Sequence, residues 1–62
     1  MSIYQPAYNA LRQAEAELNE LSKVTTDMEQ RGIIYQALTY NNKAILEVIR
    51  GGQVAGQPIK QN

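Results

Sequence analysis

The sequence predicts an all-α fold in which two helices form a hairpin and an extended C-terminal tail follows. Two stretches show the apolar spacing of helices, and residues 53–62 show no periodicity. We therefore expect helices near residues 6–22 and 27–50, which together form a hairpin domain over residues 1–52. The tail over residues 53–62 is expected to be flexible alone or docked on a partner.

The first helix is indicated by its start and by its apolar face. Pro6 suits the first helical turn, where its missing N–H leaves no hydrogen bond unmade. Apolar residues then recur at alternating spacings of four and three, close to a heptad repeat. They are Ala7, Leu11, Ala14, Leu18 and Leu21.

A turn is predicted near residues 22–26. The Val-Thr-Thr run at residues 24–26 is a poor helix interior, because β-branched residues lose side-chain freedom there. Thr26 and Glu29 have the spacing of a capping box. Asp27 would carry its negative charge in the first turn, where the helix dipole favours it. The second helix is therefore expected to begin near Asp27.

Gly32 offers an alternative position for this break. A glycine after Arg31 is typical of a helix C-terminus, and a second helix would then begin at Ile33. We prefer the earlier break. Gly32 then lies inside a helix, where it costs about 1 kcal/mol, and we expect another helix to pack closely against it.

The second helix carries a wide apolar stripe, which predicts burial between two or more helices. The stripe comprises Ile33, Ile34, Ala37, Leu38, Ala44, Ile45, Val48 and Ile49. Asn41 interrupts it, and one such amide can fix the register and the oligomeric state of packed helices. The alternative is that Asn41 faces solvent or bonds to a nearby turn. Gly51 and Gly52 are expected to end the helix.

Composition argues against catalysis and metal binding. The chain contains no Cys and no His, so it lacks the residues for a disulfide, for a thiolate zinc site and for the usual general base at neutral pH. Glu15, Glu17 and Glu20 are expected to form a solvated helix face. We therefore expect no enzymatic activity, no cofactor and no metal site.

Charge and hydropathy limit the partners. Six Lys and Arg residues balance six Asp and Glu residues and form no stripe, so we expect no nucleic acid partner. No apolar stretch approaches the roughly 20 residues of a membrane-spanning helix, and the start of the chain lacks a secretory signal pattern. We expect no membrane partner and a cytoplasmic location. A virion or an exported assembly is the alternative location.

Protein partners remain, because a chain of this size builds a core worth only about 3–5 kcal/mol. We expect self-association or docking on a larger assembly. Tyrosine is common at interfaces, and Val54, Pro58 and Ile59 are the expected anchors of the tail. The residues expected at the protein interface are Tyr4, Tyr8, Tyr35, Leu38, Asn41, Ile45, Val48, Ile49, Val54 and Ile59.

One stretch resembles a known family. Residues 37–43, Ala-Leu-Thr-Tyr-Asn-Asn-Lys, are similar to the Ala-Leu-x-x-Asn-(basic)-x-Leu-Trp helix of the FlaF flagellar regulators, with matches at Ala37, Leu38 and Asn41. The basic, Leu and Trp positions of that pattern are occupied here by Asn42, Ala44 and Ile45. The resemblance implies a small, helical, non-enzymatic protein that acts on flagellin synthesis or export.

The sequence therefore predicts a small non-enzymatic interaction module, a structural or adaptor subunit of a bacterial or phage assembly. The alternative is a regulatory protein-binding factor or chaperone, of which a FlaF-type regulator is one version.

Overall fold

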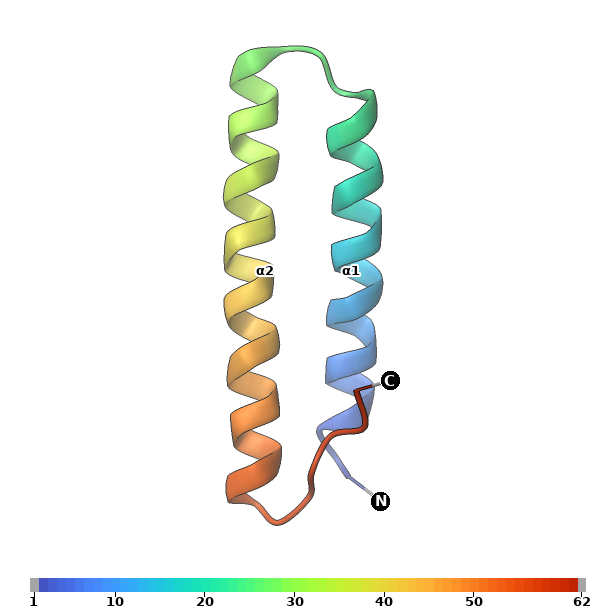
Figure 1. Ribbon diagram of the computed structural model, residues 1–62, viewed down its shortest axis with the longest axis vertical. Helices are drawn as coiled ribbons and strands as arrows, with labels where there is room; N and C mark the ends of the chain where they lie inside the picture. The colour runs from blue at the N-terminus through green and yellow to red at the C-terminus, as the bar shows by residue number, and fades with distance from the viewer. Residues whose placement is uncertain (1, 62) are drawn as a thin grey trace.

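Two antiparallel helices make up most of the protein, which confirms the predicted all-α hairpin. The computed structural model describes residues 2–61. Helix α1 spans Gln5–Val24 and helix α2 spans Met28–Val54, and residues 25–27 connect them at one end of the molecule (Figure 1). The molecule is elongated, with extents of 43 × 15 × 14 Å.

The connection lies where the β-branched run predicted it, and not at Gly32. Thr25 closes α1, because its N–H and its Oγ1 both donate to the carbonyl oxygen of Leu21, at 3.1 and 2.7 Å. The N-cap of α2 is Asp27, whose carboxylate accepts the N–H of Gln30 at 2.9 Å. The predicted capping box was wrong by one residue, since Asp27 rather than Thr26 takes the capping position.

Gly32 lies inside α2 on an exposed surface. A Cβ atom added there would meet nothing within 4 Å. The expectation that another helix packs closely against Gly32 is therefore wrong within this chain.

The end of α2 differs from the prediction, because the helix continues through Gly51 and Gly52 to Val54. Gly56 ends it with a φ of +71°, a left-handed conformation that favours glycine. The N–H of Gly56 donates to the carbonyl of Gln53 at 3.1 Å, and the N–H of Gln57 donates to the carbonyl of Gly52 at 2.7 Å. This pair of bonds is a Schellman motif, which turns the chain back toward α1.

The residues through which each helix faces the other, named the seam here, follow a heptad spacing. On α1 and the residue before it, the seam comprises Tyr4, Tyr8, Leu11, Glu15, Leu18 and Ser22, all buried or half-buried. On α2 it comprises Ile34, Leu38, Asn41, Ile45, Val48 and Gly52.

The predicted apolar face of α1 was wrong at Ala7 and Leu21, which are exposed. Tyr8 takes the place of Ala7 in the seam, and Ser22 takes the place of Leu21. A buried tyrosine removes far more apolar surface from water than an alanine does. Burying Tyr8 therefore sets the rotation of α1 about its axis.

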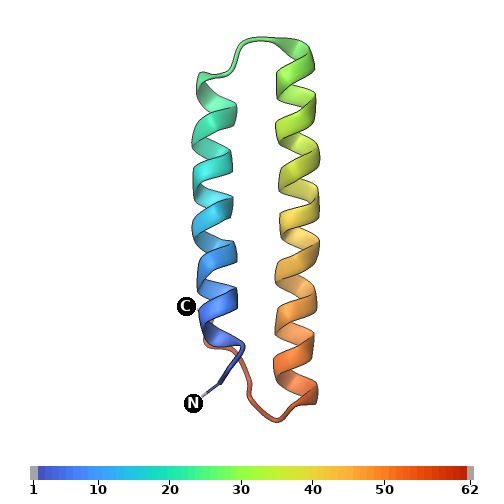
Figure 2. The ribbon, with the colours of Figure 1, turned by 180° about the vertical axis from the view of Figure 1, so that it is seen from behind.

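The tail packs back onto the hairpin and completes its core. Ile59 is 9% exposed and forms the main buried cluster with Tyr8 and Ile45. Gln5 fixes this return, because its side chain donates to the carbonyl of Lys60 at 3.1 Å and accepts the N–H of Lys60 at 2.9 Å. The tail passes in front of α1 in Figure 1 and behind it in Figure 2, so it lies against one side of the hairpin.

Candidate functional site

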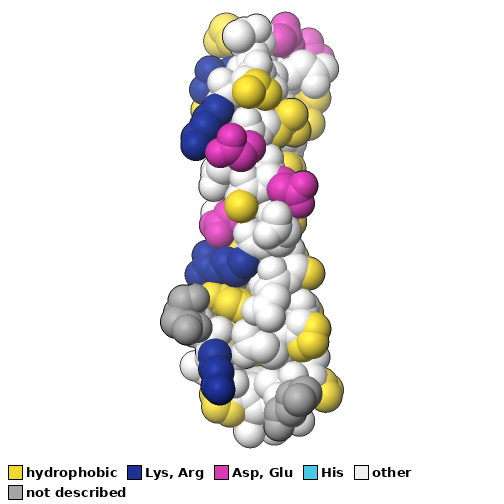
Figure 3. All heavy atoms as spheres, turned by 90° about the vertical axis from the view of Figure 1, so that its right-hand side faces the viewer, with side chains coloured by type: hydrophobic (Ala, Val, Ile, Leu, Met, Phe, Trp, Pro, Cys, Tyr) yellow, Lys and Arg dark blue, Asp and Glu magenta, His cyan; other side chains and the backbone are white. Residues whose placement is uncertain are grey.

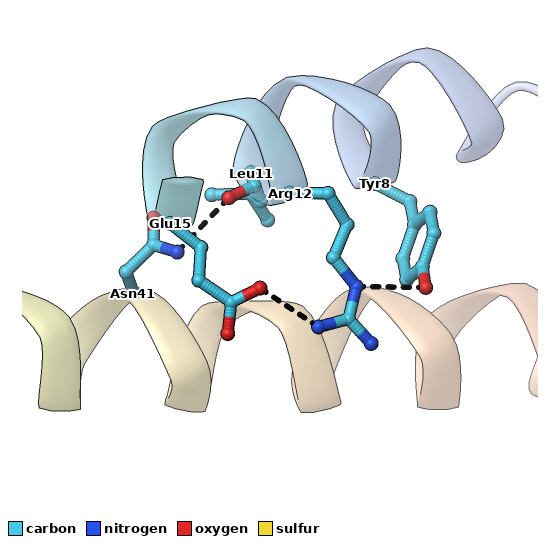
Figure 4. Close-up of polar contacts among 5 residues, drawn as sticks. All are labelled: Tyr8, Leu11, Arg12, Glu15 and Asn41. Carbon is cyan, nitrogen blue, oxygen red and sulfur yellow. Dashed lines mark hydrogen bonds and ion pairs between the residues drawn. The ribbon is translucent and has the colours of Figure 1, made fainter. Parts of the chain in front are cut away.

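Asn41 makes a polar contact that crosses the hairpin between the two helices (Figure 4). Its Nδ2 donates to the carbonyl oxygen of Leu11 at 3.0 Å, so the amide joins the two helices across the seam. Within residues 2–61, no buried side-chain nitrogen or oxygen lacks a hydrogen-bond partner. The polar residue in the apolar stripe is thus accommodated by the chain itself.

Arg12 links two seam residues on the side of α1 that carries the tail. Its Nε donates to the Tyr8 hydroxyl at 2.9 Å and its Nη1 donates to the Glu15 carboxylate at 2.9 Å (Figure 4). The bond to Tyr8, and then the bond to Glu15, raise the pKa of the Arg12 guanidinium above its ordinary value. Arg12 is therefore a permanent cation beside the buried Tyr8 ring, whose centroid lies 5.3 Å from the guanidinium carbon.

Most residues expected at a protein interface lie inside the hairpin. Buried or half-buried members are Tyr4, Tyr8, Leu38, Asn41, Ile45, Val48, Ile49 and Ile59. In this structure they hold the two helices and the tail together. Their role toward a partner stays a prediction.

The two remaining expected interface residues are exposed. Tyr35 is 50% exposed and its hydroxyl accepts a hydrogen bond from Arg31 at 2.7 Å. Val54 is 83% exposed. Of the expected tail anchors, Ile59 is buried whereas Val54 and Pro58 are exposed. The tail is thus anchored through Ile59 alone among these three.

Large apolar side chains remain exposed along the whole hairpin. They are Ile3, Leu21, Val24, Met28, Ile33, Tyr35, Tyr40, Leu46 and Val54. By contrast, the buried hydrophobic residues among those described are Tyr8, Ile34, Ile45 and Ile59. The chain thus buries a small core and leaves much apolar surface in water.

Three of these side chains, Leu21, Ile33 and Tyr40, share one flank of the hairpin with a set of exposed or half-buried alanines, and this flank is named the alanine face here. On α1 it consists of the residues directly before seam positions, Ala7, Ala10, Ala14 and Leu21. On α2 the corresponding residues are Ile33, Ala37, Tyr40 and Ala44. Two antiparallel right-handed helices present the flanks that precede their seams on the same side, so both rows share one face of the hairpin.

Basic residues are segregated from this face, whereas the acidic residues Glu17 and Glu47, which precede the seam residues Leu18 and Val48, continue its two rows. Neither row contains Lys or Arg. Figure 3 views the molecule from the α1 side, and hydrophobic side chains follow its right-hand edge while Lys and Arg side chains lie toward the left. The tail lies against one side of the hairpin (Figures 1 and 2) and bonds there to Gln5, which directly follows the seam residue Tyr4, so it lies on the flank opposite the alanine face.

Three residues of the alanine face, Ala7, Ala14 and Leu21, were expected to pack against the second helix. Ala14 is half-buried, whereas Ala7 and Leu21 are exposed. The signal for a separate face is the presence of two adjacent apolar rows on the same helix, one residue apart, of which a hairpin can bury only one.

The residues of 2–61 contain no cluster of His, Cys, Asp or Glu side chains that could hold a metal ion. Neither described helix is long and apolar enough to cross a membrane. Comparison of the chain with protein-family models, with curated proteins and with solved structures finds no match.

Proposed function

We propose that this protein is a non-enzymatic α-helical interaction module, a structural or adaptor subunit of a larger bacterial or phage assembly. The observation that carries the proposal is the imbalance between four buried hydrophobic residues and nine large exposed ones within residues 2–61. Large contiguous apolar patches on a protein surface mark sites of contact with other chains, and a subunit buries such surface in its assembly.

The shape of the molecule favours the same function. A rod of 43 × 15 × 14 Å has little interior of its own, and helical hairpins commonly complete their cores as part of a bundle. Partners are therefore other protein chains or further copies, and not nucleic acid or membrane. The site of action is the cytoplasm, with a virion or an exported assembly as the alternative.

A second function, a regulatory protein-binding factor or chaperone, is favoured by one specific feature. Residues 37–43 resemble the FlaF helix, and Ala37 and Tyr40 of this stretch lie on the alanine face. A regulator of this type would bind its target through that face and would not form a permanent assembly.

Molar mass by light scattering over a hundredfold range of chain concentration, with circular dichroism on the same samples, tests the proposal. A stable, highly helical oligomer supports the structural subunit. A poorly helical monomer that gains helicity with a partner supports the regulator. A fully helical monomer at every concentration, which also captures no other protein in a pull-down from its native source, overturns both functions.

A further inference from the structure

We propose that the alanine face binds a second copy of this chain in antiparallel orientation, so that two hairpins form a four-helix bundle. This inference rests on the proposed function and specifies the surface and the geometry of self-association. Three independent observations carry it. They are the exposed area of the chain, the distribution of large and small residues on the alanine face, and the relative positions of the two helices along the long axis of the hairpin.

The exposed area exceeds what a compact monomer of this mass shows. The chain exposes 4761 Å² at 7.0 kDa, whereas the scaling for folded monomers gives about 4,040 Å². The excess of about 700 Å² is close to the roughly 800 Å² that each partner buries in a stable interface. One additional copy is thus enough to account for the surplus surface.

Large and small residues occupy opposite ends of the alanine face. Leu21 and Ile33 lie near the connection between the helices, and Ala7 and Ala44 lie toward the other end. If a second copy packs antiparallel, its small end covers the large end of the first, so that Leu21 and Ile33 meet small side chains. Tyr40, which lies toward the small end of α2, comes over Ala37 of the second copy. A parallel copy would instead place Leu21 against Ile33 and Ala7 against Ala44, with a bulge at one end and a gap at the other.

A single two-fold axis can relate both helices of one chain to the same helices of the second copy. On α1, Ala7 and Leu21 lie seven residues to either side of Ala14. Since Asn41 bonds to the carbonyl of Leu11, the residue three positions after Leu11 lies level with the residue three positions before Asn41. Ala14 is therefore level with Leu38.

The same axis pairs the α2 residues. Ile33 and Ala44 lie five and six residues to either side of Leu38. A two-fold axis across the hairpin at this height brings Leu21 over Ala7 of the second copy and Ile33 over Ala44 of the second copy. Such a contact is isologous and closes after two chains. It also makes neighbouring helices antiparallel throughout, as in many four-helix bundles.

The one charged residue that continues the α1 row, Glu17, is compatible with this arrangement. It is exposed, and the two-fold axis places it beside the small side chains Ala10 and Ala14 of the second copy. Its carboxylate therefore reaches water at the edge of the bundle.

Disulfide cross-linking tests the orientation, because the chain has no Cys of its own. Chains with Ala7→Cys are mixed with chains with Leu21→Cys under mild oxidation, and the expected product is the mixed disulfide. The matched control mixes Asn9→Cys with Asn19→Cys. Asn9 and Asn19 are exposed and also lie at equal distances from Ala14, but on other sides of α1, and this pair is expected not to cross-link.

The outcomes separate this inference from the proposed function. Cross-linking of Ala7→Cys to Ala44→Cys in a dimer, without a product between Ala7→Cys and Leu21→Cys, overturns the antiparallel orientation and leaves the structural subunit standing. A monomer that is captured only by a different protein overturns the second copy as the occupant.

A pair of alanine substitutions tests the face itself. Ala10→Glu places a second carboxylate beside Glu17 of the other copy, so like charges face each other across the contact, and the dimer dissociation constant is expected to rise at least about tenfold. Ala16→Glu makes the same change at an exposed position of the same helix, outside the alanine face, and is expected to leave the dissociation constant within about twofold. Equal behaviour of the two variants, both dimeric, overturns the assignment of the face.

Discussion

Asn41 and Leu11 are joined across the hairpin by a 3.0 Å hydrogen bond from the side-chain amide of one to the main-chain carbonyl of the other. A carbonyl oxygen has two lone pairs, so it can accept this bond as well as its helical one. A shift of one helix along the other by one residue would remove the acceptor from reach of the amide. The bond therefore fixes the register of the two helices.

The register bond predicts a difference between two substitutions at one position. Asn41→Ala removes the bond and is expected to lower the free energy of unfolding by about 1 kcal/mol. Asn41→Asp is expected to cost more, because an ionised carboxylate cannot donate and its oxygen faces the carbonyl oxygen of Leu11. Urea unfolding at fixed chain concentration, followed by circular dichroism, measures both. Equal stability of the two variants, with Asn42→Asp as an exposed control, would contradict this account of the bond.

Two glycines of α2 are expected to respond to alanine with opposite sign. Gly32→Ala should raise the free energy of unfolding by about 1 kcal/mol, because the helix gains propensity and the new Cβ meets open space. Gly52→Ala should lower it by about 1–3 kcal/mol, since the new Cβ would lie 2.7 Å from the backbone oxygen of Gln57. Thermal melting of the two variants at one concentration checks the signs. Stabilisation by Gly52→Ala would show that the tail does not return over this glycine.

Because the tail packs back onto the hairpin, a substitution near the C-terminus is expected to have a large effect on stability. Ile59→Ala should lower the free energy of unfolding by about 2–4 kcal/mol, because it opens a cavity beside Tyr8 and Ile45. Val54→Ala is the matched control and should change stability by less than about 0.5 kcal/mol, because Val54 is 83% exposed. Denaturant unfolding of both variants provides the measurement, and similar losses at the two positions would place Ile59 outside the core.

Neighbouring residues on α2 test the rotation of the helix about its axis. Ile45 is 4% exposed and Leu46 is 66% exposed. Ile45→Ala should cost about 2–5 kcal/mol, enough to unfold much of a chain this small, whereas Leu46→Ala should leave helicity nearly unchanged. The mean residue ellipticity at 222 nm, recorded at matched concentrations, distinguishes the two. Loss of helicity in the Leu46 variant alone would mean that the seam lies on another face.

The two helices and the position of their connection could be predicted because their causes are local. Helical spacing, Pro6 near the start of α1 and the β-branched run at residues 24–26 act within a few residues of the chain. The end of α2 was predicted too early because Gly51 and Gly52 serve close packing and do not form a turn. Tyr4 lies 3.1 Å from a Cβ built on Gly51, and such contacts depend on residues far away in the sequence.

The rotation of α1 about its axis could not be predicted from hydropathy, because either of two adjacent rows of residues on this helix could have faced α2. The row with Ala7 and Leu21 is the more apolar, and the row with Tyr8 contains Glu15 and Ser22. Only the hairpin shows that Tyr8 packs against Ile45 and Ile59 and that Glu15 is held by Arg12. The alanine face is the row that lies outside the seam, although its apolar composition predicted that it would face the second helix.

The contact between Gln5 and Lys60 has a consequence for the order of folding. It joins residues 55 positions apart, so forming it before the helices have brought the two ends of the chain together would carry the entropic cost of closing nearly the whole chain. The helices and their three-residue connection form through local contacts on a microsecond scale, and the tail closes over Tyr8 afterwards. Since the hairpin has by then brought Gln5 beside the end of α2, only the residues after Val54 remain to be ordered, and the entropic cost of closing the tail is that of a short segment.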